Sequence, residues 1–474
     1  MKRFWKVLLL GGLIMAFSVP AIAAVDVKFS GSYYAQGWYI SNHELNEDKD
    51  ARAFVNQRLR VGTVFQVAEG LALTTRFDAL EKKWGDQTWK GGFEDVRDRP
   101  TYRDGAKEQE NIEFERAYVS FATGIGLFDV GYQQGSSLFG TDFLDSDESI
   151  GRVKYTLPVG PHALVLSYEK LSEDMAGNSA RDADDTAYAV GGICKLPGGE
   201  AGLIYKYLDL KSNRPEPVEL GELGELLGEL GEVTEQQLQQ ILGGGLGYKS
   251  RLHVVNPYVK MAAGPLNVEA EAYYIGGKAA EWESDQQSFH PEGDIDAESY
   301  GGYVKAQMER APGYAGVILA YMRGDDDPND DKMEGGFMPE LHWGENFNPC
   351  LILWNYDYNH DWVGNLRGSV TNTDPITGYM DNVRFGQIYA GFKPIPKLDL
   401  KASVAYAKAD ETPADVDDEY GTEADVTASY KIYNNLEYMI GAAYLWAGDY
   451  FKGTYPGYKI DDNYLLMHKL TLTF

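Results

Sequence analysis

The sequence predicts an all-β fold, a transmembrane antiparallel β-barrel of about eighteen strands. Alternating apolar and polar residues recur along most of the chain. Pairs of such runs are joined by short turns, and longer acidic segments separate the pairs. The composition agrees with this pattern: the chain has 33 Tyr, 53 Gly and 13% aromatic residues. A disordered acidic chain would lack those aromatics.

The first 23 residues are expected to form a secretory signal peptide. A basic start, an apolar run over residues 7–19 and small residues at Ala21 and Ala23 precede the expected cleavage after Ala23. The apolar run is short for a membrane anchor, and no later run reaches the roughly 18 apolar residues of a spanning helix. Residues 24–474 would then form the barrel.

The repeated unit of the barrel is visible at residues 58–78. Leu59 and Val61 alternate with Arg58 and Arg60, so that one face suits lipid and the other suits water. Seven further segments repeat this hairpin. The eight short turns are expected at residues 68–70, 123–124, 158–160, 197–199, 264–265, 312–313, 394–396 and 434–435.

One more strand at each end brings the sixteen hairpin strands to eighteen. The first is "VDVKFSGSYYAQGWYI" and the last is "YLLMHKLTLTF". These two strands must pair to close the barrel, and Leu470, Leu472 and Phe474 are expected to face lipid. With both ends on the periplasmic side, all the short turns are periplasmic and the long acidic connections are extracellular.

Three of the long connections invite specific expectations. Leucines at three- and four-residue spacing predict a helix at about 218–242, within a helical loop insertion at about 216–243. This helix would lie on the surface or fold into the barrel mouth. The connections 209–248 and 323–380 are long enough to narrow or cover the mouth, and 135–148 is a further candidate for a loop resembling the inward-folded constriction of porins.

The strand face opposite Leu59 is expected to line the pore. It carries mixed charges with a basic excess, which would stabilise passing anions. The alternative is that these charges pair across strands and hold the barrel together. Three arginines, at 58, 60 and 76, have few acids near them on this face, which favours the functional interpretation. The expected pore-lining residues are Arg58, Arg60, Arg76, Arg116, Arg152, Lys154, Lys206, Lys260, Lys305, Lys401, Glu269 and Glu271.

Metal and cysteine chemistry receive weaker support. Asp325, Asp327, Asn329 and Asp331 suggest a loose Ca²⁺ site in loop 324–336, although the glycine and final glutamate of an EF-hand are missing. A solvated acidic loop is the alternative. The two cysteines at 194 and 350 leave a disulfide open, and no c-type haem motif occurs.

Charge and motifs limit the function classes. A formal net charge of −29 argues against nucleic acid as a partner. The seven histidines are scattered without metal or hydrolase spacing, so we expect no enzyme activity, although a rim enzyme is a third alternative. Acidic outer loops would bind divalent cations that bridge to lipopolysaccharide.

The segments "FERAYVSFATGIGLFDVGYQQ", "GSSLFGTDFL" and "LTLTF" resemble Gram-negative outer-membrane porins, most of all the eighteen-stranded alginate-export family. The resemblance implies an outer-membrane channel for diffusion or export of hydrophilic, anionic solutes. It also implies assembly by the barrel assembly machinery through the strand ending at Phe474. Gln133 and Gln134 stand where many porins carry Arg, which weakens the case for anion selectivity. The alternative is a plugged docking barrel, such as a porin sheath for a partner protein.

Overall fold

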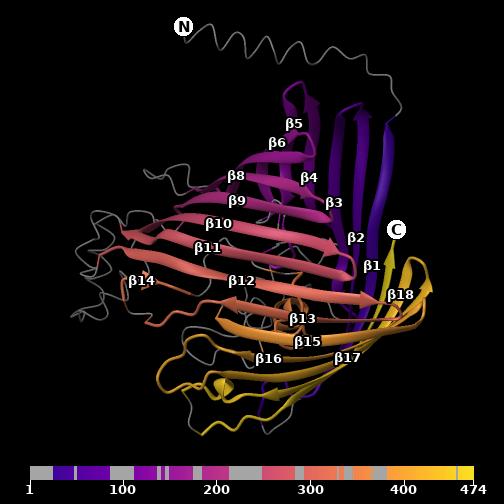
Figure 1. Ribbon diagram of the computed structural model, residues 1–474, viewed down its shortest axis with the longest axis vertical. Coiled ribbons are helices and arrows are strands. Elements are labelled where there is room, and N and C mark those ends of the chain that lie inside the picture. Colours follow the sequence, from indigo (N-terminus) through magenta and orange to yellow (C-terminus); the bar gives the residue numbers. More distant parts are fainter. Residues whose placement is uncertain are drawn as a thin grey trace.

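Eighteen long strands close into one antiparallel barrel in the computed structural model of the chain (Figure 1). The predicted signal peptide, the predicted helix at 218–242 and Asn329 lie outside the described residues. The structure describes residues 25–46, 51–85, 112–135, 140–144, 149–173, 184–212, 248–282, 293–327, 330–335, 344, 346–364, 366, 382–454 and 457–474.

Each strand pairs with its neighbours in chain order, apart from β14, a two-residue strand that pairs parallel with β12. No helix among the described residues is long and apolar enough to cross a membrane. The strands are β1 (Asp26–Ile40), β2 (Arg52–Ala68), β3 (Leu71–Lys83), β4 (Ile112–Thr123), β5 (Gly126–Gln134), β6 (Ser149–Val159), β7 (His162–Ser172), β8 (Asp185–Leu196), β9 (Gly199–Leu210), β10 (Tyr248–Ala263), β11 (Leu266–Trp282), β12 (Ile295–Arg310), β13 (Gly313–Met322), β14 (Lys332–Met333), β15 (Val383–Ile395), β16 (Leu398–Lys408), β17 (Glu419–Tyr433), β18 (Leu436–Ala447) and β19 (Asn463–Thr473).

The first and last strands close the barrel, as the sequence predicts. β1 pairs with β19 from Ser32 opposite Thr473 to Ile40 opposite Leu465. Two backbone hydrogen bonds of 2.8 and 3.0 Å between Gly31 and Phe474 extend the pairing. Figure 1 shows the indigo first strand beside the yellow end of the chain. Closure leaves no unpaired edge among the eighteen long strands, which a barrel in lipid requires.

All eight predicted short turns are present between consecutive strands, with β6 and β15 ending slightly later than expected. Some of the acidic connections are shorter than the alternation predicts, because their strands continue past the alternating residues. β11, for example, runs on to Trp282. There Glu281 forms ion pairs with Lys249 at 3.2 Å and with Arg251 at 2.9 Å, so charged residues extend the wall where the alternation of apolar residues has ended.

The outer face of the barrel is apolar and the inner face is buried. On β8, Tyr188 and Val190 point outward and are 51% and 46% exposed, whereas Ala187 and Ala189, which alternate with them, are buried. Exposed Leu, Ile, Val and aromatic side chains recur at outward positions of the other strands. A continuous apolar outer surface is the pattern of a barrel that spans a bilayer.

The apolar core lies inside the barrel, where part of the segment between β14 and β15 folds inward. Trp354 and Tyr358 of this segment are 2% and 0% exposed. The Trp354 ring packs edge-on against Phe385 of β15, with ring centroids 5.3 Å apart. Tyr358 packs in the same way against Trp38 of β1 at 6.3 Å. We call the described residues 344, 346–364 and 366 the inward segment; many of them belong to the apolar core inside the barrel.

Candidate functional site

The twelve residues expected to line the pore all occupy inward positions of their strands. The strand registers and burial patterns place them there. They divide into three groups by what they contact: arginines of β2 and β3 with acids close by, residues that fasten inward-folded chain or bridge strands, and lysines with no bonded acid. Arg116 of β4 lies directly opposite Arg76 in the sheet.

The arginines of β2 are paired with acids. Arg60 donates two hydrogen bonds to Asp78, at 2.8 Å from Nε and 2.6 Å from Nη2. Arg58 donates a longer bond of 3.4 Å to Glu81. The expectation that these arginines have few acids nearby is therefore wrong. Bidentate pairing offsets most of the positive charge that Arg60 would present to a passing ion.

Asp78 lies directly opposite Arg60 by ordinary alternation, and two irregularities in the sheet bring further acids to the arginines. The β2–β3 register shifts near Leu80, which has a left-handed backbone (φ 53°), and the shift brings Glu81 to the inner face. The β3–β4 register shifts between Arg76 and Phe77, and Glu115 then reaches Arg76, to which it is hydrogen-bonded. A bulge reverses the parity of the side chains that follow it. Acids that strict alternation assigns outward thus face the arginines.

A second group joins three strands around a buried acid. Glu169 of β7 is 0% exposed. It accepts hydrogen bonds from Arg152 Nε and Lys206 Nζ, both at 2.9 Å. Lys206 reaches across β8, where the inward residues Ala187 and Ala189 are small. Burial makes this triad structural, because removing one partner would leave a buried charge without compensation.

Arg152 also fastens the chain where β5 ends. Its Nη1 and Nη2 donate to the carbonyls of Gln134 and Gly135, both at 2.6 Å. The chain beyond Gly135 then enters the barrel: Thr141 donates its N–H to Glu271 of β11 at 3.1 Å, and its hydroxyl also bonds Glu271. Arg152 and Glu271 therefore anchor inward-folded chain, and the expected inward fold of 135–148 holds for the described residues 140–144.

The two inward parts of the chain meet in the middle of the lumen. The ring of Phe143 lies 4.8 Å from that of Tyr303 and 5.2 Å from that of Phe347, which belongs to the inward segment. Residues 140–144 thus link the β11–β12 wall to the inward segment. Together these residues occupy part of the barrel interior.

Glu423 of β17 holds the inward segment against the opposite wall. This fully buried carboxylate accepts the backbone N–H groups of Leu351, Ile352 and Leu353 at 3.0, 2.8 and 2.6 Å. Glu423 was missed as a site residue. The signal was present in the sequence, because Glu423 lies two residues before Asp425, which alternation already assigns to the inner face.

The third group consists of three lysines whose ammonium groups bond no acid among the described residues. Lys260 and Lys305 have no hydrogen-bonded or ion-paired partner within the described part of the chain. Lys401 lies over the ring of Tyr389, 4.9 Å from its centroid. A hollow of about 370 Å³ is lined by Lys305 and Lys401 together with acids and the inward segment, and an adjoining hollow of about 570 Å³ is lined by Lys260 and Lys305.

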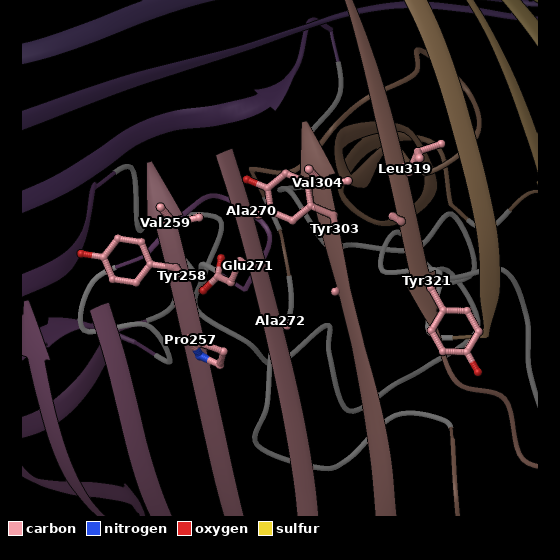
Figure 2. Close-up of a pocket in the computed structure, with 12 residues that line it drawn as sticks. Pro257, Tyr258, Val259, Ala270, Glu271, Ala272, Tyr303, Val304, Leu319 and Tyr321 are labelled. Atoms are coloured by element: carbon pink, nitrogen blue, oxygen red, sulfur yellow. The ribbon is translucent and has the colours of Figure 1, made fainter. Parts of the chain in front are cut away.

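A further hollow, of about 590 Å³, opens on the outer face of the barrel between β10 and β13. Figure 2 shows Ala270 and Ala272 on β11 between the larger Val259 and Val304 of the flanking strands. Small side chains create this depression in the lipid-facing wall. Its outward surface is largely apolar, so it is no solute site.

The predicted calcium loop is only partly described, and both cysteines are described. The Asp325 carboxylate accepts the Asp327 N–H at 3.2 Å and so stabilises a local turn. Asp325, Asp327 and Asp331 do not converge on one point, whereas Asn329 is not described. The Ca²⁺ site stays a prediction. Cys194 is exposed and Cys350 is buried, and both are free. Burial raises the pKa of the Cys350 thiol well above its ordinary value.

No protein-family model and no curated protein matches the sequence. Solved structures do resemble it. The structure of Pseudomonas aeruginosa OccK3 (OpdO) aligns with a TM-score of 0.51 and 10% identity, covering 94% of this chain and 96% of that one. A BenF-like porin from Pseudomonas fluorescens Pf-5 aligns at 0.48 and 12%, covering 94% and 99%. An anion-selective porin from Comamonas acidovorans aligns at 0.44 and 10%, covering 95% and 100%. At these identities the likeness shows the barrel fold alone.

Proposed function

We propose that the chain is an outer-membrane channel of Gram-negative type, through which small hydrophilic anions diffuse passively. The observation that carries this proposal is the contrast between the apolar outer face and the inner lysines at 260, 305 and 401, which no acid bonds among the described residues. Lipid and lipopolysaccharide would surround the barrel, and the assembly machinery would recognise the strand ending at Phe474. The reading needs no catalytic group.

The lysines, and not the arginines, are the residues to which we assign anion preference. Two unit charges about 8 Å apart interact by about 2 kcal/mol at an effective dielectric constant of about 20. An unbonded ammonium offers this attraction to a passing anion, whereas the Arg60–Asp78 pair is close to neutral at that distance. Lys305 and Lys401 line one hollow of the lumen, together with acids that bond neither of them. The two ammonium groups therefore act on an anion that passes close to them.

The inward segments favour small solutes over a polymer. Residues 140–144 and 344–366 pack against each other inside the barrel. A polysaccharide chain, the cargo that the alginate-export resemblance implies, would need a wider continuous bore. Small ions need only the hydrated hollows that these segments leave.

The same packing supports a second candidate, a plugged docking barrel that binds a partner at its acidic loops. The inward segment is fully buried at Leu353 and Tyr358. If the plug never leaves a continuous aqueous path, the barrel serves attachment and not transport.

Planar-bilayer recording of the folded protein tests both candidates. We expect steady single-channel conductance, and under a salt gradient a reversal potential whose sign indicates anion selectivity. The double variant Lys305→Ala with Lys401→Ala should shift the reversal potential toward the value expected for a cation-selective channel. Lys278→Ala is the matched control, because this outward lysine is bonded to Asp296 on the outer face.

Three outcomes separate the readings. Cation preference in the wild-type protein would contradict the assignment to the lysines. The absence of conductance from correctly folded protein would favour the docking barrel. An equal effect of Lys278→Ala would show that surface charge, and not the lumen, sets the selectivity.

A further inference from the structure

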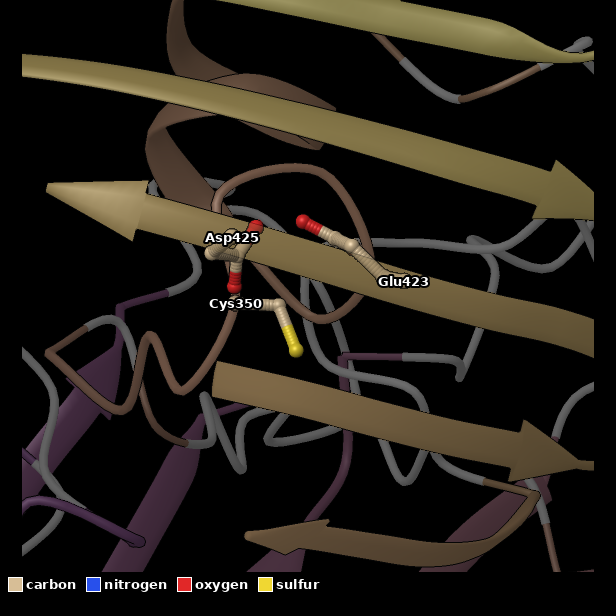
Figure 3. A group of neighbouring side chains, drawn as sticks. All are labelled: Cys350, Glu423 and Asp425. Carbon is tan, nitrogen blue, oxygen red and sulfur yellow. The ribbon is translucent and has the colours of Figure 1, made fainter. Parts of the chain in front are cut away.

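One cluster of metal-ligating side chains lies inside the barrel, beside the hollow that Lys401 lines. The Cys350 Sγ and carboxylate oxygens of Glu423 and Asp425 all lie within 4.8 Å of one another. Figure 3 shows Cys350 on the inward segment beside the two acids of β17. The three residues are 2%, 0% and 6% exposed. A thiol and two carboxyl groups are thus held together away from bulk water.

Two buried oxygens beside this cluster have no hydrogen-bond partner. They are Asp425 Oδ1 and Gln387 Oε1. Gln387 is 1% exposed; its Nε2 donates to the Pro349 carbonyl at 2.6 Å and lies 3.6 Å from Cys350 Sγ. Since Oε1 and Nε2 share one carbon, the unpartnered oxygen lies close to the cluster as well. Leaving a buried polar atom unsatisfied costs about 1–3 kcal/mol. The Glu423 and Asp425 carboxyl groups interact with each other and can share one proton. The unpartnered Gln387 oxygen beside them is therefore the atom that points to a missing ligand.

We propose that Cys350, Glu423 and Asp425 bind one divalent metal ion of the Zn²⁺ class, with the Gln387 amide oxygen as a fourth donor. A thiolate among the donors disfavours the hard cations Ca²⁺ and Mg²⁺, which take oxygen ligands. Four donors from sulfur and oxygen suit the tetrahedral coordination of Zn²⁺. On binding, the Cys350 thiol gives its proton to solvent and its sulfur takes the metal.

The charge and the surrounding hydrogen bonds fit such an ion. The ionised thiol and two carboxylates carry three negative charges, and Lys401 interacts electrostatically with Asp425 and offsets one of them. A divalent ion offsets the other two. Ser403 donates to the second oxygen of Asp425 at 3.1 Å, which fixes the carboxylate plane. Outer hydrogen bonds of this kind orient metal ligands.

The position of the ligands gives the site a role. Cys350 belongs to the inward segment, whereas the two acids belong to the barrel wall. A bound ion would clip the segment to β17, next to the three N–H groups that Glu423 already holds. The metal ion would therefore set how firmly the inward segment is held inside the lumen. The metal proposal does not depend on whether the barrel is a channel or a docking protein.

Cobalt titration of the full chain in detergent, after treatment with a chelator, tests the proposal. We expect thiolate-to-Co²⁺ absorption that saturates at one ion per chain and disappears when Zn²⁺ is added. Cys350→Ser should lose this absorption. Cys194→Ser is the matched control and should keep it, because Cys194 lies exposed on β8. Asp425→Asn should weaken cobalt binding about tenfold or more.

Folding of each protein is checked by heat-dependent gel migration and by circular dichroism. The wild-type titration alone can overturn the proposal. A folded barrel whose Cys350 is a reduced thiol, titratable with a thiol reagent, but which shows no thiolate–cobalt absorption would refute it. Retention of the absorption in Cys350→Ser, or its loss in Cys194→Ser, would place the metal elsewhere. Unchanged affinity in folded Asp425→Asn would also contradict it.

Discussion

Replacing Glu169 with Gln should destabilise the folded barrel by about 3–5 kcal/mol. The carboxylate is 0% exposed and accepts one bond each from Arg152 and Lys206, both at 2.9 Å. Hydrogen bonds to charged groups contribute about 1.5–3 kcal/mol each. The amide retains one acceptor oxygen but no charge, so two buried cations lose their counter-ion, for which a cost of about 3–5 kcal/mol is typical.

Urea unfolding of the barrel from lipid vesicles, followed by tryptophan fluorescence, measures this change. The matched control is Glu81→Gln, whose carboxylate bonds Arg58 at a looser 3.4 Å. The control should cost about 1 kcal/mol or less, since partly exposed pairs contribute little. A loss below about 1 kcal/mol in Glu169→Gln would refute the reasoning. It would mean that water reaches the triad and compensates the cations.

Three further changes probe the lining, the inward fold and the lipid face. Joint removal of Arg60 and Asp78 by alanine should leave the reversal potential unchanged in bilayer recordings, because the pair is neutral and bidentate. Thr141→Val should raise single-channel conductance, because it removes the hydroxyl bond to Glu271, a contribution of about 1–3 kcal/mol to the inward position of residues 140–144. Val404→Arg should lower the unfolding free energy in vesicles by about 2–4 kcal/mol, because Val404 is 48% exposed on the outer apolar face.

Each of these changes has an outcome that speaks against it. A shifted reversal potential in the double variant Arg60→Ala with Asp78→Ala would mean that the two side chains act separately on passing ions. Unchanged conductance in Thr141→Val would show that residues 140–144 do not limit the path. For Val404→Arg the control is Thr427→Arg, at an inward position of β17. Equal costs at the two positions would contradict the assigned faces.

The sequence by itself determined the barrel, its eight short turns and the inward direction of the lysines. These features depend on local signals, namely side chains that alternate with period two and Gly or Pro at turns. Lys260, Lys305 and Lys401 follow unbroken alternation, so their face could be assigned from neighbouring residues alone.

Only the tertiary structure decided which charges are neutralised and what fills the lumen. Bulges near Leu80 and Arg76 turned Glu81 and Glu115 inward, against the local alternation. Glu169 met Lys206 only because β8 lies between them with small side chains. The inward segment has no periodic pattern, and its apolar residues are buried only against strands far away in the sequence. Register shifts and long-range packing are properties of the closed barrel, and no short stretch of residues encodes them.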